Sequence, residues 1–198
     1  MKIKIKMEIK NLISNKGNVI NDLLIINPKV FEDNRGYFYE SWNQSSFNKS
    51  LGKEITFLQD NHSSSNIGVL RGLHYQTKNN PQGKLVRCTS GEIFDVAVDI
   101  RKSSPTFGEW ASIVLNNANK LMIWIPIGFA HGFLSLKNNS EILYKATVNY
   151  SKKDERSIRW NDEFLDIKWP LNKINFTYPH LSDKDASAPF LKSSDIFD

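Results

Sequence analysis

The sequence predicts an all-β fold, a sandwich or a barrel, formed by one domain. Short apolar or alternating segments follow one another through the chain, and turn residues separate them at roughly 8–12-residue intervals. The turn signals include Ser90-Gly91, Ser104-Pro105, Asn116-Asn117 and Asn138-Asn139. Long helical segments do not alternate with these strands, which argues against a parallel α/β sheet. A chain of 198 residues has a suitable length for one such domain.

Composition permits a large core and excludes several classes of protein. Hydrophobic residues make up 40% of the chain and aromatic residues 12%. A single cysteine, Cys88, excludes a disulfide framework and a multi-cysteine metal site. The net charge of +5 tolerates an anionic partner without demanding one, and we expect no nucleic-acid partner. We see neither a membrane span nor a signal peptide, so we expect no membrane partner and a cytoplasmic protein.

The first elements are the least regular. Residues 1–20 are interpreted as an N-terminal extension of weak structure, and residues 21–198 as the single domain. A short apolar strand at 22–27 ends at a proline. The stretch 31–36 resembles a turn, and 35–42 alternates like a strand, with a carboxylate on an otherwise aromatic face.

One helix and many strands follow. Apolar residues at helical spacing predict a helix over 43–51, which ends at Gly52. A strand at 55–59 leads into the polar cluster 59–62, and a loop is expected at 63–68. The remaining expected strands are 69–76, 83–89, 92–100, 109–115, 120–125, 131–137 and 142–150. In the strand 92–100, one face carries Ile93, Asp95, Ala97 and Asp99.

Two of these strands carry a histidine near a glycine. The segments that contain His74 and His131 resemble the two motif regions of the cupin superfamily, whose fold is a jelly roll or double-stranded β-helix. Many cupins bind a metal through a His-x-His pair, but here Gln76 stands at the second position and is a poor ligand. We therefore expect a cupin-type jelly roll with a few short helices, no metal and no other cofactor.

The resemblance becomes specific when the segments are taken together. About a dozen segments, in the same order along the chain, resemble dTDP-4-dehydrorhamnose 3,5-epimerases and cover roughly residues 22–190. Among them are Asp33–Gly36, Gln59–His62, Val69–Gln76, Gln82–Arg87, Gly128–Phe133 and Leu181–Pro189. The first twenty residues and the stretch Asn172–His180 depart from the pattern of the family.

The resemblance implies a reaction. Protons at C3 and C5 of dTDP-4-dehydro-6-deoxy-D-glucose lie next to the C4 ketone, and their removal and return from the other face give dTDP-4-dehydro-L-rhamnose. This requires a base, a donor for the enolate oxygen and an acid on the opposite face. By resemblance, His74 is the base and Asp185 its partner, Lys84 stabilises the enolate, and Tyr144 is the acid. A nearby cation such as Lys84 is expected to lower the pKa of Tyr144.

The resemblance also implies the binding residues and the assembly. The expected contacts to the dTDP-sugar substrate are Arg35, Glu40, Gln59, Asp60, Asn61, Arg71, His131, Tyr150, Glu155 and Lys184. A homodimer is expected, and the Lys-Ile-Lys-Ile-Lys start is interpreted as an additional edge strand at its interface. Strict alternation puts Arg71 and His74 on opposite strand faces, so either a bulge at Gly72 is needed or Arg71 serves the partner's site.

Other functions stay open at this point. Relatives that epimerise one centre only, or that act on another nucleotide's sugar, would carry a similar set of residues. A non-catalytic sugar-binding cupin has no need of His74, Lys84, Tyr144 and Asp185 together, and Gln76 disfavours a metal-dependent oxygenase.

Overall fold

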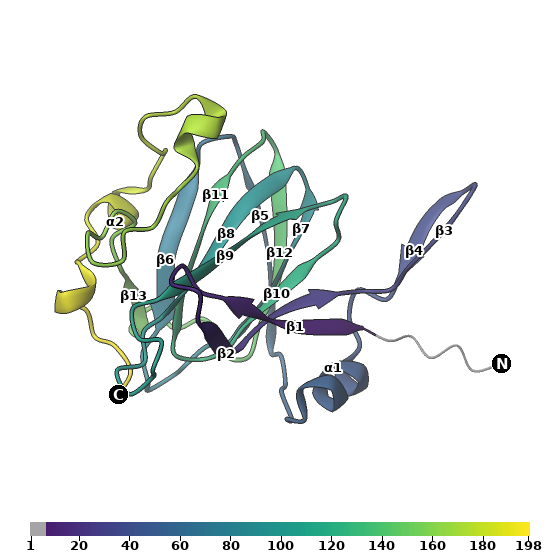
Figure 1. Cartoon of the computed structure of the whole chain (residues 1–198), viewed down its shortest axis with the longest axis horizontal. Coiled ribbons are helices and arrows are strands. Elements are labelled where there is room, and N and C mark those ends of the chain that lie inside the picture. The colour runs from purple at the N-terminus through teal and green to yellow at the C-terminus, as the bar shows by residue number, and fades with distance from the viewer. Residues whose placement is uncertain (1–6) are drawn as a thin grey trace.

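Figure 1 shows the computed structural model of the chain, which describes residues 7–198. Its helices are α1 (Gln44–Leu51) and α2 (Asp183–Ala186), with 3₁₀ turns at Leu171–Ile174 and Leu191–Ser193. Its strands are β1 (Glu8–Ile13), β2 (Val19–Asn27), β3 (Val30–Asp33), β4 (Gly36–Tyr39), β5 (Gln59–Ser65), β6 (Leu70–Gln76), β7 (Lys84–Ser90), β8 (Glu92–Asp99), β9 (Trp110–Asn116), β10 (Met122–Ile125), β11 (Phe129–Ser135), β12 (Ser140–Ala146) and β13 (Glu155–Ser157).

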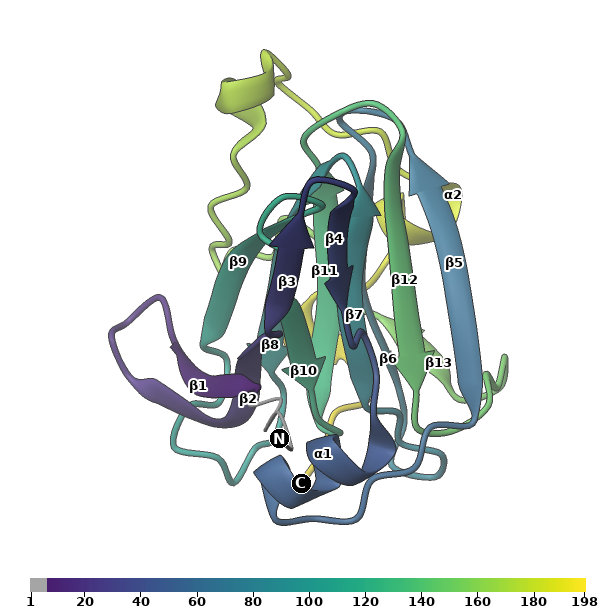
Figure 2. The ribbon, with the colours of Figure 1, turned by 90° about the vertical axis from the view of Figure 1, so that its right-hand side faces the viewer.

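Two antiparallel sheets face each other and form the jelly roll that the sequence predicts (Figure 2). One sheet has six strands in the order β1-β2-β10-β7-β12-β5, and the other has five in the order β13-β6-β11-β8-β9. Strands that are distant in sequence are therefore neighbours in space. The third sheet is the hairpin of β3 and β4, which projects away from the two large sheets (Figure 1).

Apolar side chains pack in three layers. Between the two sheets, Val86 and Ile123 of one sheet meet Ala97 and Phe133 of the other. The C-terminal segment after β13 covers the outer face of the five-stranded sheet, where Trp169 packs among the apolar side chains of that face. Helix α1 covers part of the outer face of the six-stranded sheet through aromatic contacts such as those in the cluster around Trp124. The jelly roll is thus supported on both outer faces.

Helix α1 begins and ends where the sequence predicts. The side chain of Asn43 accepts a hydrogen bond from the backbone N–H of Ser46, which caps the first turn. At the other end Gly52 has φ 66°, the left-handed conformation that ends many helices. Local chemistry therefore fixes both ends of this helix.

The structure corrects three expectations for the first third of the chain. The segment expected to be weakly structured contains β1, because its apolar side chains pair with those of β2, as in Ile9 opposite Ile26. The turn expected over 31–36 is present but limited to Asn34 and Arg35, because the residues on either side pair as the β3–β4 hairpin. The strand expected at 55–59 begins only at Gln59, as β5. The inward side chains of β5 are polar because they line a polar cavity, so its sequence lacks the apolar alternation that predicts a strand. The Lys-Ile-Lys-Ile-Lys start, expected as an edge strand, lies outside the described residues.

A bulge in β6 resolves the conflict between Arg71 and His74. In the pairing of β6 with β11, His74 lies opposite His131 and Arg71 lies opposite Phe133, so three steps on β6 match two on β11. Gly72 sits within this irregularity with φ 132°, and a Cβ there would lie 2.5 Å from the Gly132 Cα. The extra residue brings Arg71 and His74 to the same side of the sheet.

Candidate active site

A cavity of about 300 Å³ lies between the two sheets, beside the apolar core. Its lining is mostly polar and comes from both sheets: Asn61, His62, Ser63, Arg71, His74, Tyr75, Gln76, Gln82, Lys84, His131, Phe133, Ile142, Tyr144, Tyr150 and Glu155. Eight of the residues that the sequence analysis selected are among them. The two sheets therefore gather into one place residues that the sequence spreads over nearly one hundred positions.

His74 stands on the wall formed by the five-stranded sheet, and a buried carboxylate holds it from behind. Its Nε2 lies 2.5 Å from Oδ1 of Asp185, which α2 brings against β6. Burial alone would raise the pKa of Asp185, but hydrogen bonds from His74 and from Ser182 outweigh it and hold that pKa below its usual value. Asp185 is therefore ionised at neutral pH, and His74 donates its Nε2–H to it.

Lys84 projects from β7, on the opposite wall, and is only 8% exposed. Burial lowers the pKa of its ammonium to about 8, although Asp95 and Glu155 favour the charged form. At pH 7 about nine-tenths of the Lys84 side chains still carry their proton. Among the described residues no carboxylate lies within 4.0 Å of this ammonium, so its N–H groups are available to a ligand in the cavity.

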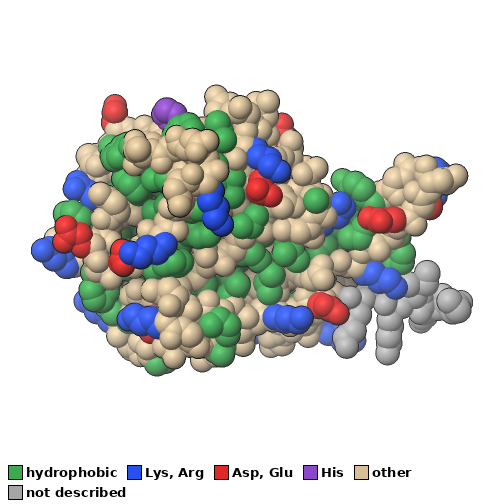
Figure 3. All heavy atoms as spheres, turned by 45° about the horizontal axis from the view of Figure 1, so that its top comes forward, with side chains coloured by type: hydrophobic (Ala, Val, Ile, Leu, Met, Phe, Trp, Pro, Cys, Tyr) green, Lys and Arg blue, Asp and Glu red, His purple; other side chains and the backbone are tan. Residues whose placement is uncertain are grey.

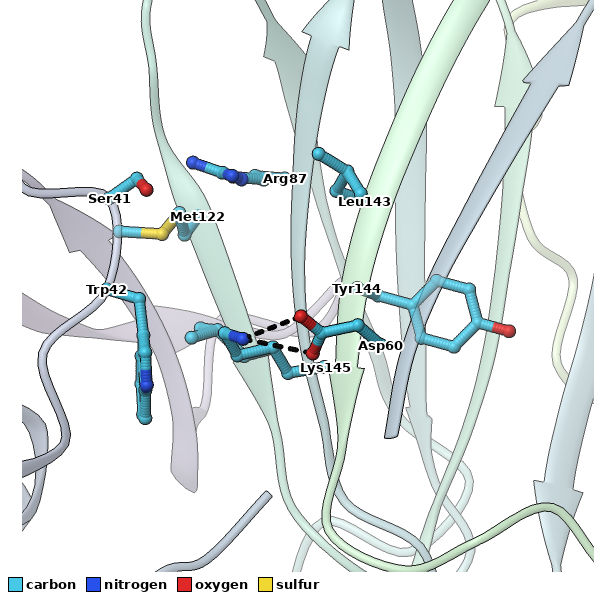
Figure 4. A pocket seen from close by; sticks show the side chains of 9 residues that line it. Ser41, Trp42, Asp60, Arg87, Met122, Leu143, Tyr144 and Lys145 are labelled. Atoms are coloured by element: carbon cyan, nitrogen blue, oxygen red, sulfur yellow. Dashed lines mark hydrogen bonds and ion pairs between the residues drawn. The ribbon is translucent and has the colours of Figure 1, made fainter. Parts of the chain in front are cut away.

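Tyr144 comes from β12, next to β7, and faces the same cavity. Figure 4 shows its ring directed away from Asp60 and Lys145, to the other side of the sheet. Burial raises the pKa of Tyr144 and Glu155 adds to the rise, whereas Arg71 opposes it. The expectation that a cation lowers this pKa was wrong, because loss of water around the phenol outweighs the one nearby cation. The phenol consequently stays protonated well above neutral pH.

A second histidine–carboxylate pair was missed by the sequence analysis. Nε2 of His131 lies 2.8 Å from Oδ2 of Asp95, which is completely buried. The alternation of β8 places Asp95 on the face of Ile93 and Ala97, and a carboxylate on an apolar face is the signal that could have revealed it. His131 and His74 are opposite each other across β11 and β6, so the two imidazoles are neighbours.

The rim of the cavity is a network of hydrogen bonds. Lys184 donates to Glu155 at 2.8 Å, and the hydroxyl of Tyr150 donates to the same carboxylate at 3.1 Å. Gln59 accepts from the backbone N–H of Tyr150 at 2.8 Å and donates to Asn61 at 2.9 Å. Tyr150 itself is 53% exposed, with its ring at the mouth of the cavity.

Three of the expected binding residues lie elsewhere in the chain. Asp60 is on the outer face of the six-stranded sheet, where both its oxygens accept from Lys145 at 2.9 Å (Figure 4). Arg35 lies at the tip of the β3–β4 hairpin, 85% exposed in its side chain and paired with Asp33. Glu40 follows β4 and accepts a hydrogen bond from Asn43. One chain alone does not bring these three to its own cavity.

The amide of Gln76 accepts from the backbone of Ser151 and donates to that of Asn80, so it ties loops together. Within residues 7–198, three or more His, Cys, Asp or Glu side chains nowhere gather as metal ligands would. None of the helices described is both long enough and apolar enough to cross a bilayer. On the face that Figure 3 shows, cationic and anionic side chains are interspersed.

An imidazole on one wall of the cavity and an ammonium and a phenol on the other are groups of the kind that a proton-transfer isomerase needs. Comparison with known proteins specifies which kind, because the family model described as dTDP-4-dehydrorhamnose 3,5-epimerase matches residues 18–193. The chain belongs to this family, and the resemblance seen in the sequence is confirmed.

Similar proteins support this assignment over most of the chain. A dTDP-4-dehydrorhamnose 3,5-epimerase of Salmonella typhimurium is 57% identical over 87% of this chain and 92% of its own. The crystal structure of a Legionella pneumophila dTDP-6-deoxy-D-glucose-3,5-epimerase in complex with dTDP-4-keto-L-rhamnose has TM-score 0.85 and 45% identity, covering 94% of each chain. A 3'-monoepimerase of Streptomyces bikiniensis in complex with dTDP-quinovose is also similar, with TM-score 0.80 and 31% identity, covering 86% of this chain and 84% of its own.

Proposed function

We propose that this cavity epimerises C3 and C5 of dTDP-4-dehydro-6-deoxy-D-glucose and so makes dTDP-4-dehydro-L-rhamnose. The observation that carries the proposal is the placement of His74 on one wall and of Lys84 and Tyr144 on the other. Inversion of a carbon next to a ketone needs a base on one face of the sugar and an acid on the opposite face. Two facing sheets supply both, with the sugar between them.

His74 removes the protons through its Nδ1. Its Nε2 is engaged by the ionised Asp185, so in the neutral imidazole the free lone pair is on Nδ1. Once Nδ1 has taken a proton, the imidazolium is stabilised by the same carboxylate. Asp185 is buried and held by Ser182, which fixes the direction of the ring. The pair acts as an oriented base.

Lys84 and Tyr144 act on the other side. Deprotonation next to the C4 ketone moves negative charge onto its oxygen, and a buried ammonium with free N–H groups stabilises that oxygen more strongly than it would in water. Tyr144 stays protonated in the cavity, so its hydroxyl can deliver the proton to the face away from His74. The proton lost to His74 and the one gained from Tyr144 balance, and solvent resets both groups.

The other residues hold the nucleotide. Arg71 lines the cavity, where Ser65 and the Ser64 carbonyl orient its guanidinium, a group suited to the diphosphate. The exposed ring of Tyr150 offers its face to the thymine. The remaining contacts that we propose come from the rim and the wall: Gln59, Asn61, His131, Glu155 and Lys184.

We further propose that the protein is a homodimer in which Arg35 and Glu40 reach the partner's cavity. The β3–β4 hairpin stands away from its own sheets (Figure 1), and its aromatic side chains Tyr37 and Phe38 are largely exposed in one chain. Asp60, on the outer face of the six-stranded sheet, then belongs to the surface that the partner approaches. The hairpin would thereby complete each site with a second diphosphate cation.

Hydrogen exchange tests the proposed reaction. With the 4-keto substrate in D₂O, we expect deuterium at both C3 and C5 by NMR, and His74→Ala should abolish both signals. Tyr144→Phe should spare exchange more than inversion, because the base remains. His62→Ala, at a histidine that lines the cavity rim and pairs with Glu141, is the matched control and should keep both. Deuterium at one carbon only would indicate a mono-epimerase, and none would refute the proposal.

Mixing two inactive variants tests the shared site. If Arg35 acts in the partner's cavity, a heterodimer of Arg35→Ala and His74→Ala retains one complete site of two, so a reassembled mixture should recover about a quarter of full activity. If Arg35 acted within its own chain, every mixed site would lack one group and nothing would be recovered. Separately, each variant should elute as a dimer in size-exclusion chromatography.

A further inference from the structure

Asp95 is the most unusual charged residue of the fold outside the residues assigned above. Its side chain is completely buried, and only Oδ2 has a partner, His131 Nε2. Within residues 7–198, Oδ1 is the one buried side-chain nitrogen or oxygen without a hydrogen bond. Native proteins seldom leave a buried carboxylate oxygen unpaired, because the loss of water is costly. Such an atom therefore calls for a reason.

The position of Asp95 suggests that reason. It projects from β8 into the space between the sheets, where Ile93 and Ala97 on the same face belong to the apolar core. Lys84 projects into this space from the opposite sheet and is itself buried without a carboxylate within 4.0 Å among the described residues. Asp95 is the leading electrostatic influence that favours the charged form of Lys84. A buried carboxyl group and a buried ammonium thus lie on opposite walls of the barrel.

We propose that Asp95 is a positioning residue for the epimerase reaction: its carboxylate keeps Lys84 charged and orients His131, although it touches neither substrate nor reacting atoms. The proposal rests on the function proposed above. The carboxylate accepts Nε2–H of His131 and so leaves Nδ1 of that ring directed elsewhere, as Asp185 does for His74. The two histidine–carboxylate pairs then differ in their task, because one supports the base and the other supports the oxyanion donor.

The separation of Asp95 from Lys84 suits this task. A carboxylate in direct contact with the ammonium would occupy the N–H groups that the enolate needs and would weaken their pull on it. A carboxylate held further away by His131 favours the charge of Lys84 and leaves its donors free. The ionisable and charged groups that face this space are His62, Arg71, His74, Tyr75, Lys84, Asp95, His131, Tyr144, Tyr150 and Glu155.

Asp95→Asn is the variant that separates charge from shape. Asparagine has nearly the same size and its amide oxygen can still accept Nε2–H of His131, but it carries no charge. Without the carboxylate, Lys84 should lose its proton at lower pH than in the wild type. We therefore expect the alkaline limb of kcat/KM for C5 exchange to move down by about one pH unit, and kcat at pH 8 to fall about fivefold with KM changed less than about threefold.

Asp99→Asn is the matched control. Asp99 is on the same face of β8 and is equally buried, but its oxygens are used by Arg101, Ser104 and Thr106, away from the cavity. The folded fraction of this variant should show the alkaline limb of kcat/KM at the same pH midpoint as the wild type, even if the substitution changes its stability. An unchanged limb in Asp95→Asn, or an equal displacement in Asp99→Asn, would overturn the proposal.

NMR of the wild-type protein gives a second test that needs neither turnover nor a folded variant. Nitrogen-15 shifts should place the proton of neutral His131 on Nε2. A proton on Nδ1 alone would mean that Asp95 is the protonated donor and cannot sustain the charge of Lys84, which would refute the inference. If the wild type showed no exchange at all, the proposed function would fail, while these shifts would still show whether Asp95 is the acceptor of the His131 proton.

Discussion

Replacing Lys84 with methionine should make the protein more stable and inactive. The ammonium titrates at about 8 in the fold and at about 10.5 in the unfolded chain. Each pKa unit corresponds to 1.36 kcal/mol, so holding the charged lysine in the cavity costs about 3 kcal/mol at neutral pH. Methionine fills a similar volume without a charge. The protein thus retains a buried charge that lowers the stability of its fold, as is expected where function requires that charge.

The sign of the pH dependence follows from the same shift. Below pH 8 both the folded and the unfolded chain hold the proton, and the whole cost is present. Between about 8 and about 10.5 the unfolded chain binds more protons, so the stability of the wild type rises with pH relative to that of Lys84→Met. By about pH 9.5 the difference in unfolding free energy between the two proteins should be about 2 kcal/mol smaller than at pH 7.

Urea unfolding at pH 7 and at pH 9.5 measures, at each pH, the difference in unfolding free energy between the wild type and Lys84→Met. Groups that titrate in both proteins cancel in this comparison. Lys145→Met is the control, because Lys145 lies on the neighbouring strand, on the outer face, and forms an ion pair with Asp60. It should gain nothing and lose under about 1 kcal/mol. If Lys84→Met were no more stable than the wild type at pH 7, or if its advantage did not change with pH, burial would not be acting on this lysine as argued.

The remaining predictions concern Asp185 and Gly72. Asp185→Asn should lower kcat about 10²–10⁴-fold, because His74 loses the carboxylate that fixes its tautomer, and steady-state kinetics on the folded variant measures this; near-normal kcat would contradict the pairing. Since the pKa of Asp185 is depressed in the fold, its stabilising contribution is present at neutral pH and is lost on acidification, so the variant should show a weaker loss of stability between neutral and acid pH. Gly72→Ala should cost more than about 3 kcal/mol or prevent folding, since its Cβ would lie 2.5 Å from Gly132, whereas Gly17→Ala, with open space around it, should cost about 1 kcal/mol in the same denaturation assay.

The sequence is most informative where local chemistry and periodicity agree. Asn43 and Gly52 mark both ends of α1, and the strands from β7 to β12 follow from their apolar patterns and turn residues. It is least informative for β5, whose polar sequence gives no apolar alternation. The reason is physical, since a strand that lines a polar cavity does not need the apolar face on which periodicity depends.

The sequence by itself determined the jelly roll, the family and the identity of the groups for acid–base chemistry, because these depend on residue type and order. Tertiary structure decided where those groups lie. The bulge at Gly72 puts Arg71 on the same side of β6 as His74, and the pairing of β11 with β8 brings Asp95 under His131. Burial raised the pKa of the Tyr144 phenol against expectation. Register, burial and charge depend on neighbours distant in sequence, which local patterns do not encode.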